Sequence, residues 1–182
     1  MKTLLIFLAA ARLLSAQERP AAWAQPVTAT GLPNFHRVTE TVYRSAQPWA
    51  EGFRAVEKMG IRTVISLRDD VGDEEFAAGT KLRLVRVPVT LAGINDDAVL
   101  RVLAELEKKE NGPFLVHCQM GADRTGAVMA MHRIVVQGWK REDALREMRE
   151  GGFHFGIEAF ARYVESADIA RLRAALAAMK AR

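Results

Sequence analysis

Short apolar, β-branched segments alternate with segments of helical periodicity along most of this chain. The following have the composition of strands: residues 38–43, 61–67, 82–89 and 114–117. The following have helical spacing of apolar side chains or helix start and stop signals: residues 53–59, 99–106, 125–137, 141–149 and 157–179. This alternation predicts an α/β fold of three layers, in which helices flank a mostly parallel central sheet.

The first 24 residues have the pattern of a secretory signal. Lys2 gives a positive start, residues 3–11 form a short apolar stretch, and a small-x-small pattern ends at Ala24. We therefore expect cleavage after Ala24, or as a second choice after Ala16, and a periplasmic or secreted location in a bacterium. The alternative is an uncleaved amphipathic anchor helix, because Arg12 interrupts the apolar stretch.

The composition narrows the classes of protein to which this chain can belong. Of the 182 residues, 49% are hydrophobic and 26% are charged, which is typical of a globular protein. Residues 25–34 contain two prolines and a glycine and are predicted to be a linker or an extended lead-in, which leaves residues 35–182 as one domain. A net charge of +4, with basic and acidic residues interleaved, argues against nucleic-acid binding. No apolar run is long enough for stable membrane insertion after signal removal, and a single Cys cannot form an internal disulfide.

Residues 117–126, His-Cys-Gln-Met-Gly-Ala-Asp-Arg-Thr-Gly, connect a predicted strand to a predicted helix. The N–H groups of such a loop and of the helix start converge on one point and favour an anion there. The same field stabilises a thiolate, so Cys118 is expected to be a nucleophile. Arg124 can hold two phosphate oxygens through its planar guanidinium. A buried structural thiol is the alternative for Cys118, but the strand, loop and helix context favours catalysis.

The other residues of this loop are predicted to contact or position the substrate. His117 is expected to orient the loop, Gly121 to relax its turn, and Thr125 to hydrogen-bond the thiolate. The predicted substrate-binding set is His117, Gln119, Met120, Gly121, Ala122, Asp123 and Thr125.

The loop resembles that of the Cys-x5-Arg tyrosine and dual-specificity phosphatases, most closely their exported bacterial members. Residues 43–48, 131–134 and 137–139 extend the resemblance over most of residues 35–165. It implies hydrolysis of phosphate monoesters without a metal or other cofactor, with Cys118 as nucleophile, Arg124 as phosphate clamp and an Asp as general acid. The implied partner is a phosphorylated protein, with phosphotyrosine favoured. The histidines have no metal-ligand spacing, which agrees with a metal-free site.

The general acid is the least defined residue of the predicted site. Where many relatives carry an Asp, residues 90–93 are Thr-Leu-Ala-Gly. Asp96 and Asp97 are the carboxylates of this loop, and Asp96 is our predicted acid; alternatively, both are first-turn residues of the next helix, beside Asn95 as a natural N-cap. Asp123 is a second candidate, with helix capping as its alternative role.

Three other functions fit parts of this pattern. Gly-x-Asp-Arg-Thr also resembles phosphatases that act on phosphoinositides, so a phosphoinositide or inositol phosphate is the alternative substrate. The displaced acid would also suit a catalytically weak module that binds phosphorylated ligands. A rhodanese-like sulfurtransferase uses a loop Cys too, but the Arg-Thr-Gly at this offset favours phosphate chemistry.

Overall fold

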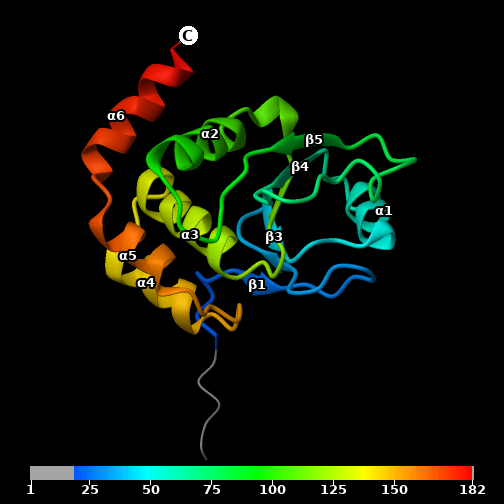
Figure 1. Ribbon diagram of the computed structural model, residues 1–182, viewed down its shortest axis with the longest axis horizontal. Coiled ribbons are helices and arrows are strands. Elements are labelled where there is room, and N and C mark those ends of the chain that lie inside the picture. The colour runs from blue at the N-terminus through cyan, green and yellow to red at the C-terminus, as the bar shows by residue number, and fades with distance from the viewer. Residues whose placement is uncertain (1–18, 182) are drawn as a thin grey trace, which may run out of the picture.

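A six-stranded, mostly parallel sheet forms the centre of the molecule (Figure 1). The computed structural model describes residues 19–181, so most of the predicted signal lies outside the described residues. The strands are β1 (Gln25–Pro26), β2 (His36–Arg37), β3 (Val42–Ser45), β4 (Thr63–Ser66), β5 (Arg83–Arg86) and β6 (Phe114–His117). Their order is β1-β2-β3-β6-β4-β5, in which β3, β6, β4 and β5 are parallel and β1 and β2 add an antiparallel edge. The predicted α/β class is confirmed.

Helices cover both faces of this sheet (Figure 1). One face carries α1 (Ala50–Lys58). The other carries α2 (Asp96–Leu106), α3 (Asp123–Met131), α4 (Arg141–Glu150), α5 (Glu158–Ser166) and α6 (Ile169–Lys180). A 3-10 turn, η1 (Lys109–Asn111), precedes β6, and a π-helical turn, η2 (His132–Val136), extends α3. Within residues 19–181, no helix is both long and apolar enough to span a bilayer.

Alternate residues of the central strands build two separate cores. Leu115 of β6 packs in a cluster with Phe53 of α1, whereas Val116 lies in the larger cluster that α2 and α3 complete. Successive side chains of a strand point to opposite faces, so a strand that is apolar throughout must be covered on both. Strand β6 therefore lies at the centre of three layers, and its carboxyl end is held firmly from both sides.

Of the two alternatives that we predicted for residues 25–34, the structure has an extended lead-in that belongs to the domain and not a separate linker. These residues contribute β1, which pairs with β2, and the Val27 N–H donates to the Phe35 carbonyl at 2.9 Å. Leu32 and Phe35 are buried in the core beside α1. Pro26 lies in the edge strand β1, where a missing N–H is tolerated, and the Gly31 carbonyl accepts the Trp49 N–H at 2.9 Å at the start of α1.

The last predicted helix, over residues 157–179, is instead two helices. Helix α5 ends at Ser166 and α6 begins at Ile169. The Asp168 side chain accepts the Arg171 N–H at 3.0 Å and so caps α6, a signal that the continuous Ala-rich pattern concealed. A cap that we did predict is confirmed, since the Asn95 side chain accepts the Ala98 N–H at 3.0 Å at the start of α2.

Candidate active site

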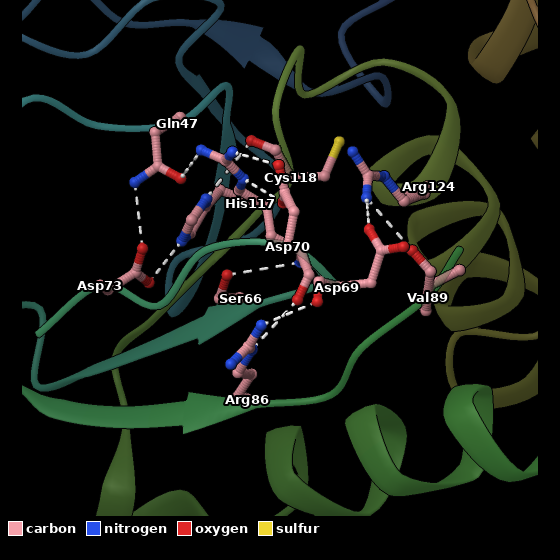
Figure 2. A network of polar contacts seen from close by, with 11 residues as sticks. Gln47, Ser66, Asp69, Asp70, Asp73, Arg86, Val89, His117, Cys118 and Arg124 are labelled. Atoms are coloured by element: carbon pink, nitrogen blue, oxygen red, sulfur yellow. Dashed lines mark hydrogen bonds and ion pairs between the residues drawn. The ribbon is translucent and has the colours of Figure 1, made fainter. Parts of the chain in front are cut away.

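The loop after β6 brings Cys118 and Arg124 together. Figure 2 shows the Cys118 sulfur facing the guanidinium of Arg124, which lies in the first turn of α3. Cys118 is only 2% exposed, so its sulfur lies at the floor of the site. Between them, Gly121 has a φ of 66°, and a Cβ there would collide with the backbone of Ser45. Only glycine fits this position without strain.

The carbonyl groups of this loop are bound from the β3 side. Arg44 donates to the Gly121 carbonyl at 2.7 Å, the Gln47 N–H to the Gln119 carbonyl at 3.1 Å, and the Asn34 amide to the Met120 carbonyl at 2.9 Å. In the part of the chain that the structure describes, no backbone N–H of residues 119–122 has a protein acceptor. A loop with its carbonyls bound and its N–H groups free is an anion-binding site.

Arg44 is a buried charge that supports the loop. Its side chain stacks on Phe153, with its central carbon 3.7 Å from the ring centroid. Burial lowers the pKa of Arg44 to about 10, opposed by the negative charges of Glu147 and Cys118. Arg44 therefore adds positive charge near Cys118 from behind the loop, where its role is structural rather than direct contact with substrate.

A chain of polar contacts lies under the start of the loop (Figure 2). His117 is fully buried, and its Nε2 lies 2.8 Å from Asp73 Oδ2. Gln47 donates to Asp73 at 3.0 Å and accepts from Arg68 at 3.0 Å. Burial alone would raise the pKa of Asp73, but the hydrogen bonds from His117 and Gln47 and the charges of His117 and Arg68 lower it overall. These contacts fix the end of β6 from which Cys118 projects.

Arg124 is held through only one of its nitrogens. Its Nη1 donates to Asp69 Oδ1 at 2.9 Å and to the Val89 carbonyl at 3.1 Å. Its Nε and Nη2 have no acceptor among residues 19–181. The edge formed by Nε and Nη2 can therefore take two oxygens of one phosphate.

Asp69 is the site residue that our sequence reasoning missed. It follows β4, and its carboxylate points at Arg124 in Figure 2. Residues at the carboxyl end of a parallel strand are candidates for chemistry, so the Arg-Asp-Asp sequence after β4 was an available signal. We expected the general acid in the loop after the next strand, predicted over residues 82–89, and this expectation did not include Asp69.

The two carboxylates that we predicted as acids are engaged elsewhere. Asp96 accepts the Tyr163 hydroxyl at 2.8 Å and lies 3.3 Å from Arg171. Burial, followed by this hydrogen bond, raises the pKa of Tyr163. Asp123 accepts the N–H groups of Gly156 and Ile157 at 2.8 and 2.7 Å. In the described chain, neither carboxylate has a polar contact with Cys118 or Arg124.

The remaining predicted positions differ in exposure. Gln119 and Met120 are exposed, Ala122 is buried, and Asp97 is exposed on α2. Thr125 is fully buried, and its hydroxyl has no hydrogen-bond partner, so the expected bond to Cys118 is not formed.

The motif at residues 131–139 has a structural role. Arg133 pairs with both carboxylate oxygens of Glu147 at 2.8 Å and stacks on Trp139. Arg133 also donates to the Ala22 carbonyl at 3.1 Å, while the Ala24 N–H donates to Glu147 at 2.6 Å. The motif thus joins α4 to the chain before β1.

The fold and the loop together define a cysteine-dependent phosphatase. Residues 27–164 match the family described as DSP-PTPase phosphatase fused to NAD+ kinase, and the chain belongs to this family. It is 39% identical over 167 residues to the dual specificity protein phosphatase TpbA of Pseudomonas aeruginosa, covering 90% of this chain and 75% of that protein. It is 29% identical over 154 residues to the inositol diphosphatase DSP5 of Arabidopsis thaliana, covering 79% and 74%.

Solved structures give the same result. The structure of a P. aeruginosa TpbA variant in complex with pTyr superimposes with a TM-score of 0.79 at 37% identity, covering 87% of this chain and 98% of that one. This agreement confirms the predicted phosphatase activity and the fold.

Proposed function

We propose that this protein removes phosphate from tyrosine side chains of proteins through a phosphocysteine intermediate. The observation that carries the proposal is the set of free N–H groups at residues 119–122, next to the Cys118 sulfur and the free edge of Arg124. These groups match the three non-bridging oxygens of a phosphate monoester. They hold the charge that those oxygens carry in the transition state.

In the first step, the Cys118 thiolate attacks phosphorus. The sulfur–phosphorus bond forms as the bond from phosphorus to the ester oxygen breaks, and the leaving phenolate takes up a proton from solvent water. In the second step, water attacks phosphorus and passes a proton to the solvent. The new oxygen–phosphorus bond forms as the sulfur–phosphorus bond breaks, which releases phosphate and the Cys118 thiolate. Arg124 contacts the phosphate oxygens throughout, and Arg44 holds the loop carbonyl at Gly121 in place.

Asp69 has a positioning role in this proposal. By binding Nη1, Asp69 and the Val89 carbonyl turn the other edge of Arg124 to the phosphate. Asp96 stays bound to Tyr163, so proton donation to the leaving oxygen is weak in this site. A phenol needs much less help to leave than an aliphatic alcohol, which favours phosphotyrosine over phosphoserine.

The relatives support this substrate and suggest a second. TpbA is a dual specificity protein phosphatase and has been solved with pTyr. DSP5 is an inositol diphosphatase, which makes inositol phosphates the second candidate class. Assays of phosphopeptides against inositol phosphates, at equal concentration, separate the two.

Export to the periplasm is also part of the proposal. Its support is the charged start and apolar stretch of residues 1–11. Fusion of residues 1–30 to a reporter enzyme that works only outside the cytoplasm tests it. A reporter that stays inactive contradicts export.

Hydrolysis of p-nitrophenyl phosphate is the primary test of the chemistry. The wild-type protein should turn it over without added metal and in the presence of a chelator. Cys118→Ser should abolish turnover while still binding inorganic phosphate, because the N–H groups and Arg124 remain. Turnover by Cys118→Ser at the wild-type rate would contradict the mechanism.

A further inference from the structure

Exposed apolar side chains gather around the entrance to the active site. Among residues 19–181, the large apolar side chains with substantial exposure are Trp49 at 62%, Met120 at 61%, Leu91 at 60%, Met59 at 44%, Met179 at 42% and Val71 at 40%. Four of these, which we call the apolar rim, lie beside the phosphate loop: Trp49, Val71, Leu91 and Met120.

Three of the rim residues lie two positions along the chain from a residue that binds the phosphate loop or Arg124. Met120 belongs to the loop itself. Trp49 comes two residues after Gln47, whose N–H binds the Gln119 carbonyl. Val71 comes two residues after Asp69, and Leu91 two residues after Val89, and both of those residues bind Arg124. Two residues of chain span at most about 7 Å, so four separate segments bring apolar side chains to one entrance.

The exposure of these residues contrasts with the burial of the nucleophile. Cys118 is 2% exposed, whereas Met120, two residues further on, is 61% exposed. The phosphate must therefore pass below the rim to reach the sulfur. A group that lies between them, such as the ring of a phosphotyrosine, contacts apolar side chains and gains free energy from their burial.

Charged side chains of both signs lie beside the entrance. Asp69 and Asp70 have side chains that are 37% and 59% exposed. The hydrogen bond from Arg68 lowers the pKa of Asp70, which therefore stays ionised. Arg68 is paired with Asp70 and Arg124 with Asp69. Within the described chain, Arg86 donates only to the backbone carbonyls of Arg68 and Asp69 and keeps its positive charge. Charge therefore does not decide between the two substrate classes. The further phosphates of an inositol polyphosphate would instead lose water against the apolar rim without gaining a hydrogen-bond partner there.

We propose that the apolar rim selects phosphotyrosine within peptide segments that have apolar neighbours, and that it disfavours inositol polyphosphates. This inference rests on the proposed function and names the substrate class of the same site. The rim binds the tyrosine ring and the side chains next to it, while the phosphate loop binds the phosphate.

Three substrates test the selection. They are a phosphotyrosine peptide with Leu and Ile on both sides, the same peptide with Glu at those positions, and inositol hexakisphosphate. The apolar peptide should have a kcat/KM about tenfold above that of the acidic peptide, as expected from a few buried apolar contacts. Phosphate release from the inositol compound should be slower still.

Variants of the rim give the second part of the test. Trp49→Ala and Leu91→Ala should each reduce kcat/KM for the apolar peptide about fivefold to tenfold, mainly by raising KM, and should reduce the preference over the acidic peptide. Met59→Ala and Met179→Ala are matched controls, because they remove exposed apolar side chains outside the rim. These controls should leave the preference unchanged.

The outcomes separate this inference from the proposed function. If the wild-type protein hydrolyses p-nitrophenyl phosphate but treats both peptides alike, or prefers the inositol compound, the inference is wrong and the chemistry stands. The same holds if the rim variants behave like the Met59 and Met179 controls. If no aryl phosphate is hydrolysed at all, the proposed function fails first.

Discussion

The two sides of Cys118 are built differently. On the β3 side, Arg44, Gln47 and Asn34 each bind a carbonyl of the phosphate loop, and Arg44 is fully buried. On the β5 side, residues 90–93 have an exposed Leu91, and Gly93 has a φ of 152° with open space where a Cβ would stand. One side is fixed by buried hydrogen bonds, whereas the other has few contacts.

This difference matches the two ends of the substrate. Phosphate is the same in every substrate, so a rigid, preorganised loop binds it well and stabilises its transition state. The group that carries the phosphate varies, and a loop with few contacts can accommodate it. The predictions below test how far the fixed side determines activity and stability.

The largest effect is expected from Gly121→Ala. The new methyl group would meet the Ser45 backbone, and the residue would still need a positive φ, so the loop must shift. A displacement of about 1 Å at such a site reduces kcat about 100-fold. Steady-state hydrolysis of p-nitrophenyl phosphate measures it. Gly93→Ala also strains a positive φ, but on the open side, and serves as the comparison; equal losses in both variants would remove the distinction between the two sides.

Arg44→Met tests the buried support directly. This change keeps most of the volume over Phe153 but leaves the Gly121 carbonyl without its donor. Loss of one partner of a buried hydrogen bond costs about 1 to 3 kcal/mol of unfolding free energy. Urea denaturation should show this loss, together with reduced activity. Unchanged stability would mean that the buried charge is as costly as the bond is favourable.

Acidic pH should destabilise the same β3 side of the site. Burial is the main cause that lowers the pKa of His36 to about 4, with the charges of Arg44 and Arg19 acting in the same direction against Asn34 and Glu147. Because the folded value lies below the unfolded value, the stability that neutral His36 gives is complete above about pH 6.5 and is lost as the pH falls towards 4.

Between pH 6.5 and 5, this loss should reach about 2 kcal/mol of unfolding free energy. Urea denaturation at several pH values measures the slope of the unfolding free energy against pH. His36→Phe removes the titrating group and keeps a ring against Phe153, so its slope should be smaller. Identical slopes for the two proteins would show that other groups cause the acid sensitivity.

The smallest effect is expected from the carboxylates. Asp69→Asn weakens one hydrogen bond to Arg124 and should reduce kcat/KM about fivefold. Asp70→Asn is the matched control, because Asp70 pairs with Arg68 instead.

Asp96→Asn should leave the rate on an alkyl phosphate near the wild-type value. A large loss on the alkyl substrate alone would restore Asp96 as the general acid.

The sequence predicted best what depends on neighbouring residues. The β6 boundaries, 114–117, agree with the structure, and Cys118 and Arg124 are brought together by one strand, one turn and one helix. Local periodicity and the fixed offset between the two residues carry this information.

What the sequence did not reveal depends on distant contacts. Asp69 lies 55 residues before Arg124, and Arg44 lies 77 residues before Gly121. No periodicity links such pairs, and only the order of the strands brings β3 and β4 to either side of β6. Asp96 shows the converse, because its position in the sequence suited an acid while Tyr163 of α5 holds it.

The contacts of Arg133 and Glu147 bear on how the chain could mature. A signal peptidase that cut after Ala24 would remove the Ala22 carbonyl from Arg133 and the Ala24 N–H from Glu147. It would also remove Arg19, which donates to the Gly151 carbonyl at 2.7 Å. A cut after Ala16 would leave all three contacts in place, so the cleaved protein would retain a short N-terminal arm that completes its own domain.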